Sequence, residues 1–255
     1  MKGVKTMKQI IKNNLKYLIF LAIFGLVGGY FAIVYSLQGI SQEMLDEVIA
    51  QLGSIEAVIL ISVIQYFSYS IILGILGKIL AKKIGLWRSV EFNKKGNTEL
   101  IIVSLIGGAA FILFDVLIFA NFHEAIQNSY AAKPTVEYII ASITYGGVIE
   151  EVMMRLFFMS LVAFLIQKIS KKEEINEKIL IIANVIAALL FAAGHIPATA
   201  MAMELTPIVL IRCFVMNGGF GLAFGRLYRK YGIQYAMLAH AGVHIISKLI
   251  WILCI

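Results

Sequence analysis

The chain has 255 residues, of which 60% are hydrophobic and only 15% are charged, and its mean hydropathy is +0.89. This composition lies far from that of an average soluble or disordered chain and indicates a polytopic membrane protein. The net charge of +7 is spread over the connections between apolar segments, so it does not indicate a nucleic-acid partner.

Seven apolar segments come near the length of about 20 residues that a helix needs to cross a bilayer. In chain order they are Tyr17–Ser36, Ala57–Leu80, Leu100–Phe119, Val136–Ile166, Ile179–His195, Ile208–Phe224 and Tyr235–Ile255. The fifth and sixth are short, which leaves partial or tilted crossings and an eighth, broken crossing open. We predict an all-α, polytopic transmembrane bundle of seven or eight helices, forming a single membrane domain over residues 1–255.

Lysine and arginine are concentrated in alternate connections. They precede the first span and fill the second, fourth and sixth connections, whereas the first connection is acidic and the third contains only Lys133. The positive-inside rule therefore predicts a cytoplasmic N-terminus and an extracytoplasmic C-terminus in the plasma membrane, with lipid as the surrounding partner. The basic group before the first span is Lys2, Lys5, Lys8, Lys12 and Lys16.

Adjacent glutamates, Glu150 and Glu151, lie inside the fourth segment, with Arg155 one helical turn later. A carboxylate at that depth costs several kcal/mol unless it is paired, protonated or hydrated. Because Glu151 and Arg155 are four residues apart with the acid first, we expect them to form an ion pair. Glu150 would then point about 100° away and face a cavity. The alternative is a structural knot of three charges between helices.

Three of the four histidines also lie in hydrophobic segments. His195 follows Phe191 by one turn and ends the fifth segment, where we expect Pro197 to stop the helix. His240 and His244 project from one side of the last span and can converge on a ligand, a water or a metal. The alternatives are an interfacial His195 and two histidines that only join helices by hydrogen bonds.

Weaker candidates are intramembrane polar residues that could line the same cavity, pair with each other or extend to the interface. They are Asp115, Arg212, Asn217 and Lys248. Residues 1–135 contain three predicted spans but no motif that indicates a chemistry.

Three short stretches follow one another in the chain: Glu150-Glu151-Val-Met-Met-Arg155, Phe191-Ala-Ala-Gly-His195 and His240-Ala-Gly-Val-His244. Their order and spacing resemble the motifs EExxxR, FxxxH and HxxxN/D. These are motifs of the CAAX protease and bacteriocin-processing family, also called the Abi family, whose members include type II CAAX prenyl endopeptidase-like proteins. The resemblance covers about residues 135–250, and the order and spacing together make it specific. His244 stands where the family usually has Asn or Asp.

The resemblance implies an intramembrane endopeptidase in which Glu150 activates a water and His195 orients it or shares its proton. His240 and the residue at 244 would stabilise the oxyanion, while Glu151, Arg155 and Phe191 would support these groups. The family is often labelled metalloprotease, so Zn²⁺ held by Glu150, His195, His240 and His244 stays open beside a metal-independent mechanism. The substrate would be a prenylated protein tail, a bacteriocin leader or a signalling peptide.

Two other classes of function also place acids and histidines in a membrane. A proton-coupled transporter would do so, although the sequence contains no inverted repeat that supports it. A non-catalytic immunity or peptide-binding protein could keep the cavity without the reaction, and His244 is compatible with such an inactive relative.

Overall fold

The computed structural model describes residues 7–255, with side chains from Asn14 onward. Every regular element within this range is helical, which confirms the all-α prediction. Lys2, Lys5, Lys8 and Lys12, predicted to flank the first span, lie outside the described residues or side chains.

Six segments of the described chain are long and apolar enough to cross a membrane. They contain α1 (Met7–Gln38), α3 (Ile55–Lys83), α4 (Lys94–Leu117), α8 (Glu177–Gly194) with α9 (Ile196–Ala202), α10 (Pro207–Cys213) with η4 (Phe214–Gly218) and α11 (Gly219–Tyr231), and α12 (Ile233–Cys254). The chain is therefore a multi-pass membrane protein.

The fourth predicted span is also present, as an unbroken helical run over residues 136–169. It consists of α6 (Val136–Ala141), η2 (Ser142–Glu150), η3 (Val152–Met159) and α7 (Ser160–Ile169). Since η2 and η3 are π-helical, no single part of the run reaches the length of a crossing. With this composite helix the described chain has a helix at each of the seven segments that hydropathy indicates as crossings.

The fifth and sixth spans are longer than the sequence indicates. The fifth helix ends at His195 as expected, since α8 stops at Gly194 and His195 is its C-cap. A separate short helix, α9, then begins at Ile196 and holds Pro197 in its first turn. Proline is tolerated there, since the first N–H groups of a helix have no partner within the helix. The sixth span likewise continues through α11 to Tyr231.

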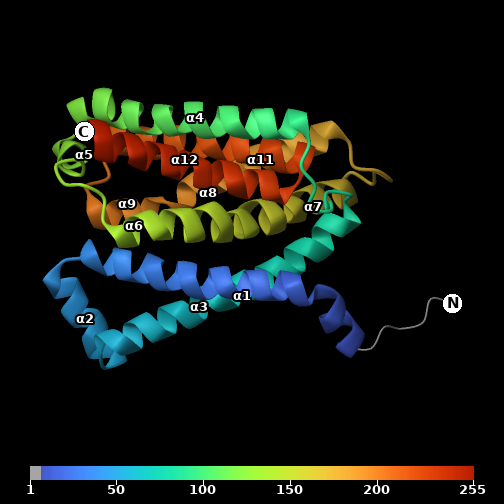
Figure 1. The fold of residues 1–255 in the computed structure, drawn as a ribbon, viewed down its shortest axis with the longest axis horizontal. Helices are drawn as coiled ribbons and strands as arrows, with labels where there is room; N and C mark the ends of the chain where they lie inside the picture. Colours follow the sequence, from blue (N-terminus) through green and yellow to red (C-terminus); the bar gives the residue numbers. More distant parts are fainter. Residues whose placement is uncertain (1–6) are drawn as a thin grey trace.

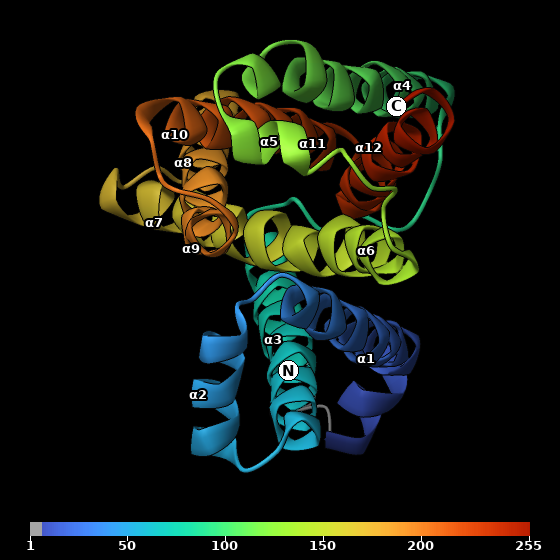
Figure 2. The ribbon, with the colours of Figure 1, turned by 90° about the vertical axis from the view of Figure 1, so that its left-hand side faces the viewer.

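The helices form layers that place the composite helix in the middle of the molecule (Figures 1 and 2). On one side, α1 and α3 pack on η2 and η3, and on the other side α12 packs on η2 and α4. Glycines permit this close approach, as in other membrane helices. A methyl group at Gly147 would lie 2.8 Å from Cβ of Ala241, and one at Gly77 would lie 2.9 Å from the carbonyl carbon of Leu156.

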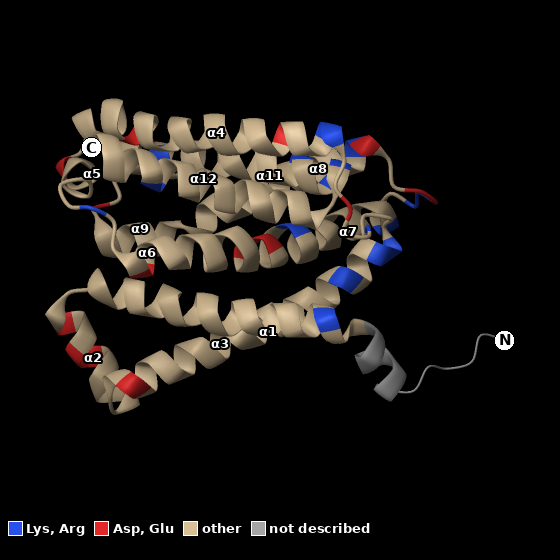
Figure 3. Ribbon diagram, viewed as in Figure 1, with Lys and Arg blue, Asp and Glu red and all other residues tan. Residues whose placement is uncertain are grey.

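Short helices occupy two connections at the end of the bundle where α1 ends. The first connection contains α2 (Gln42–Leu52), whose N-terminus is capped by the Ser41 side chain, and the third contains η1 (Phe119–Asn121) and α5 (Glu124–Asn128). Figure 3 shows lysine and arginine concentrated at the opposite end, near α7 and the start of α4. This separation of charge follows the predicted topology, and the orientation in the membrane stays a prediction.

Candidate active site

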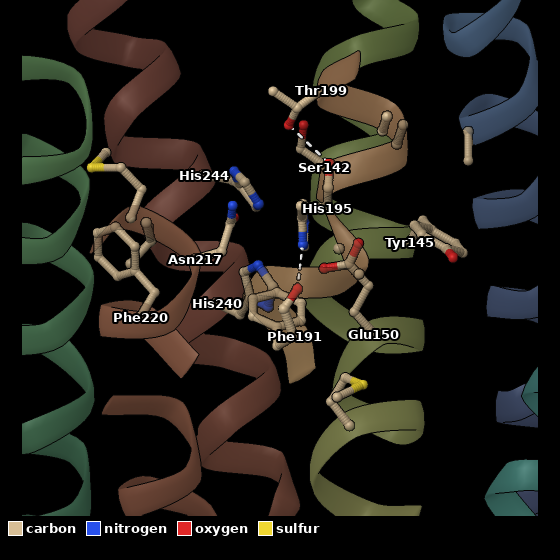
Figure 4. Close-up of a pocket in the computed structure, with 18 of the residues that line it drawn as sticks. Ser142, Tyr145, Glu150, Phe191, His195, Thr199, Asn217, Phe220, His240 and His244 are labelled. Atoms are coloured by element: carbon tan, nitrogen blue, oxygen red, sulfur yellow. Dashed lines mark hydrogen bonds between the residues drawn. The ribbon is translucent and has the colours of Figure 1, made fainter. Parts of the chain in front are cut away.

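A cavity of about 560 Å³ lies between the composite helix, α8, α9 and the C-terminal helices. Its walls include Glu150 on η2, His195 between α8 and α9, and His240 and His244 on α12. Figure 4 shows these four side chains directed toward one space. The structure therefore brings together the four residues that the sequence analysis chose as candidate catalytic groups.

All three π-helical segments of the described chain contribute to this cavity. η2 supplies Glu150, η3 supplies Met153 and Met154, and η4 supplies Met216 and Asn217. π-helical turns are rare and are frequently found at functional sites. The placement of these segments around the cavity favours a functional role for it, independently of the sequence motifs.

The ion pair predicted between Glu151 and Arg155 is confirmed, with 2.9 Å between Oε1 and Nη1. The same carboxylate oxygen lies 2.8 Å from Nδ1 of His240. All three side chains are buried, so the charges are shielded from solvent and act on each other strongly. Glu151 therefore orients a histidine of the cavity as well as neutralising Arg155.

Aromatic rings enclose this buried group. The guanidinium of Arg155 lies 4.4 Å from the ring centroid of Phe191 and 5.5 Å from that of Phe224. The His240 ring stacks on Phe224 at a centroid distance of 4.4 Å. Phe191 and Phe224 thus both contact the charge network, and of the two only Phe191 belongs to a sequence motif.

His195 is fixed by the backbone of its own helix. Its Nδ1 lies 2.7 Å from the carbonyl oxygen of Phe191. A carbonyl oxygen only accepts hydrogen bonds, so Nδ1 must carry a proton and Nε2 of the neutral ring is left as an acceptor. An acceptor at this position can hold a water by one of its protons.

His244 and His240 turn their Nε2 atoms toward the composite helix. A methyl group built on Gly146 would lie 3.2 Å from Nε2 of His244 and 3.8 Å from Nε2 of His240. The missing side chain of Gly146 therefore leaves space next to both nitrogens, one turn before Glu150. The two rings stack at a centroid distance of 4.9 Å.

Glu150 is half-buried and makes no hydrogen bond or ion pair with any residue that the structure describes. It lies close enough to Tyr66 and Tyr145 for electrostatic interaction with both phenols. Its adjacent glutamate is neutralised by Arg155, so Glu150 is the carboxylate that remains available to the cavity.

The arrangement does not fit a metal site. Within residues 14–255, no group of three or more His, Cys, Asp or Glu side chains is placed to hold a metal ion. The zinc alternative therefore gains no support from the placement of these side chains.

The weaker polar candidates separate into two groups. Asp115 is buried and paired with Arg212, whose Nε lies 2.6 Å from Oδ1, and it also accepts a hydrogen bond from Tyr130. Asn217 lines the cavity, and Lys248 contacts His244. The contact between Lys248 and His244 is compatible with helical spacing, because they are four residues apart.

The family comparison agrees with the motif analysis. Residues 131–246 match the family model described as type II CAAX prenyl endopeptidase Rce1-like. Searches of curated proteins and of solved structures gave no match. Members of this family are peptide hydrolases, and the matched region contains Glu150, His195, His240 and His244. Over residues 131–246, the chain is therefore similar to the Rce1-like type II CAAX prenyl endopeptidases.

Proposed function

We propose that this protein is an intramembrane endopeptidase in which Glu150 activates a water for attack on a peptide bond. The observation that carries the proposal is the meeting of one carboxylate without an ion-pair partner and three imidazoles in a cavity inside a membrane bundle. A carboxylate in such surroundings suits a general base, since little water competes for its lone pairs. The Rce1-like match supports the same reaction class.

In the proposed reaction Glu150 takes a proton from the water as the oxygen attacks the carbonyl carbon of the substrate. His195 accepts the second water proton in a hydrogen bond through Nε2 and so orients the attack. The carbonyl oxygen becomes an oxyanion, which the Nε2 atoms of His240 and His244 face across the space at Gly146. Glu150 then returns its proton to the leaving nitrogen as the C–N bond breaks.

The charge network beneath the cavity suits the role proposed for His240. Its Nδ1 donates to the Glu151 carboxylate, which holds the ring with Nε2 toward the cavity. In the proposed reaction the imidazolium form of His240 donates to the oxyanion through Nε2. Preorganised donors of this kind contribute on the order of 3 kcal/mol each.

The position of the cavity favours a substrate from the extracytoplasmic side. The lining extends from Met154 past Glu150 to the end of α1 at Tyr35 and Ser36 and to Met203 beyond α9. This end is opposite to the one rich in lysine and arginine (Figure 3), which the positive-inside rule places in the cytoplasm. We therefore favour an exported peptide, such as a bacteriocin leader or signalling peptide, over a cytoplasmic prenylated tail.

The test compares the parent protein with Glu150→Gln in detergent, using mass spectrometry of a peptide library that includes prenylated CAAX peptides. We expect Glu150→Gln to lower cleavage by about 10²–10⁴-fold, the usual contribution of a general base. The matched control is Glu99→Gln, because Glu99 pairs with Arg226 and does not line the cavity. Thermal unfolding of each variant checks the fold.

Three results would overturn the proposed reaction, and a fourth would contradict the proposed side of entry. Full activity of Glu150→Gln would remove Glu150 from the reaction. Peptide binding without cleavage by the parent would favour a non-catalytic peptide-binding protein, and proton-coupled uptake by proteoliposomes would favour a transporter. If inverted vesicles cleave a membrane-impermeant peptide and right-side-out vesicles do not, the proposed side of entry is wrong.

A further inference from the structure

The three histidines of the cavity are not held in the same way. His195 and His240 direct Nδ1 to oxygen acceptors, the Phe191 carbonyl and the Glu151 carboxylate. His244 instead directs Nδ1 to the side-chain nitrogen of Lys248, at 3.4 Å. A donor there requires the opposite tautomer, with Nδ1 as the acceptor and the proton on Nε2.

Lys248 is placed to keep this contact. It lies one turn after His244 on α12 and is only 3% exposed. Its Nζ also lies 4.1 Å from the ring centroid of Tyr138, where a positive charge is stabilised by the face of the ring. None of the described carboxylates forms an ion pair with it, so the ring of Tyr138 and Nδ1 of His244 are its polar surroundings. An ammonium group donates hydrogen bonds and accepts none.

We propose that Lys248 is a positioning residue that fixes His244 as the Nε2–H tautomer, so that this N–H donates to the oxyanion. The inference rests on the proposed function and extends it to a residue outside the family motifs. Nε2 of His244 faces the space at Gly146, where the oxyanion is proposed to form. An asparagine amide at this position would donate without help, whereas a neutral histidine donates through Nε2 in only one of its two tautomers.

A double-mutant cycle separates this role from general packing. The four proteins are the parent, Lys248→Met, His244→Asn and the double variant, because methionine keeps the apolar stem and removes the donor. In the His244 background we expect Lys248→Met to lower kcat about tenfold with little change in KM, less than the 10²–10³-fold cost of losing an oxyanion donor entirely. In the His244→Asn background we expect it to change kcat less than about twofold, since the amide has no tautomer to fix.

Two further variants control the cycle. Lys248→Arg should restore most of the activity, because a guanidinium also donates and never accepts. Lys133→Met removes a lysine that bonds the carbonyl oxygens of Trp251 and Ile252 on the same helix, outside the cavity. It should leave kcat unchanged, and so controls for the loss of a positive charge near α12.

The tautomer can also be observed without turnover. In protein with ¹⁵N-labelled histidine, the parent should show His244 with a protonated Nε2 and an unprotonated Nδ1, and Lys248→Met should lose this preference. Equal losses of activity from Lys248→Met in both backgrounds, or an Nδ1–H signal for His244 in the parent, would overturn the inference. If the parent cleaves nothing, the proposed function fails while the tautomer measurement still decides the role of Lys248.

Discussion

Replacing Glu151 by leucine removes the carboxylate on which the buried charge network depends. Glu151 is 0% exposed and Arg155 is 1% exposed, so the substitution leaves a guanidinium without its partner in a place that water does not reach. Breaking a buried ion pair from one side costs about 3–5 kcal/mol. His240 also loses a charge-assisted hydrogen bond, which is part of the same total.

A loss of this size is a large fraction of the 5–15 kcal/mol that usually separates folded from unfolded states. Reversible unfolding in mixed detergent and SDS micelles, followed by near-UV circular dichroism, would measure it. The matched control is Glu99→Leu, whose partner Arg226 lies on the surface with a side chain 48% exposed. Exposed pairs contribute about 1 kcal/mol or less, so the two leucine variants should differ by several-fold in free energy.

The double variant Glu151→Leu with Arg155→Met makes the argument refutable. If the cost of Glu151→Leu comes from an unpaired charge, removing the charge should recover most of the lost stability, because well-packed apolar pairs of similar volume are often no less stable than buried ion pairs. A double variant that loses the sum of both single effects would show that packing, and not charge, is responsible. A Glu151→Leu protein as stable as Glu99→Leu would also refute the predicted cost of the unpaired charge.

Two further predictions concern packing and pH. Gly147→Val should lower the free energy of unfolding by about 1–3 kcal/mol, because even its Cβ would lie 2.8 Å from Cβ of Ala241. The control is Gly219→Ala, whose added Cβ would have nothing within 4 Å and which should be neutral or stabilising in the same unfolding assay. Burial and the charge of Asp115 raise the pKa of Tyr130 above its ordinary value, so above pH 10 the unfolded chain loses this proton while the folded protein keeps it. The stability advantage of the parent over Tyr130→Phe should therefore shrink by about 1.4 kcal/mol per pH unit above pH 10, and an advantage independent of pH would contradict this assignment.

The four candidate catalytic residues of the cavity could be identified from the sequence, because a polar or ionisable side chain inside a membrane segment costs free energy. Glu150, His195, His240 and His244 stand out in apolar segments, and their motif order links segments that are distant in the chain. The partner of Glu151 could also be predicted, because spacing along a helix decides whether Arg155 reaches it. Their roles in catalysis remain proposals.

Other features depend on how neighbouring helices are rotated, which hydropathy does not record. The hydropathy of residues 136–169 does not distinguish a π-helical turn from an α-helical one, since the whole run is apolar apart from a few residues. The bond between His240 and Glu151 joins residues 89 positions apart and depends on the crossing of α12 with the composite helix. Lys248 could equally have extended toward the interface, and only the packing of Tyr138 against it shows that it turns inward.

The stability of Lys248→Met provides a last distinction between positioning and structural roles. A buried ammonium without a carboxylate partner loses its hydration, and the ring of Tyr138 returns only part of that cost, about 2 kcal/mol. A residue kept for catalysis can be unfavourable for folding, because activity and stability are often opposed at functional sites. We therefore expect Lys248→Met to unfold at the same or a higher denaturant concentration than the parent while its kcat falls. A structural lysine would lower both quantities together, so measuring the two on one sample decides which of them Lys248 serves.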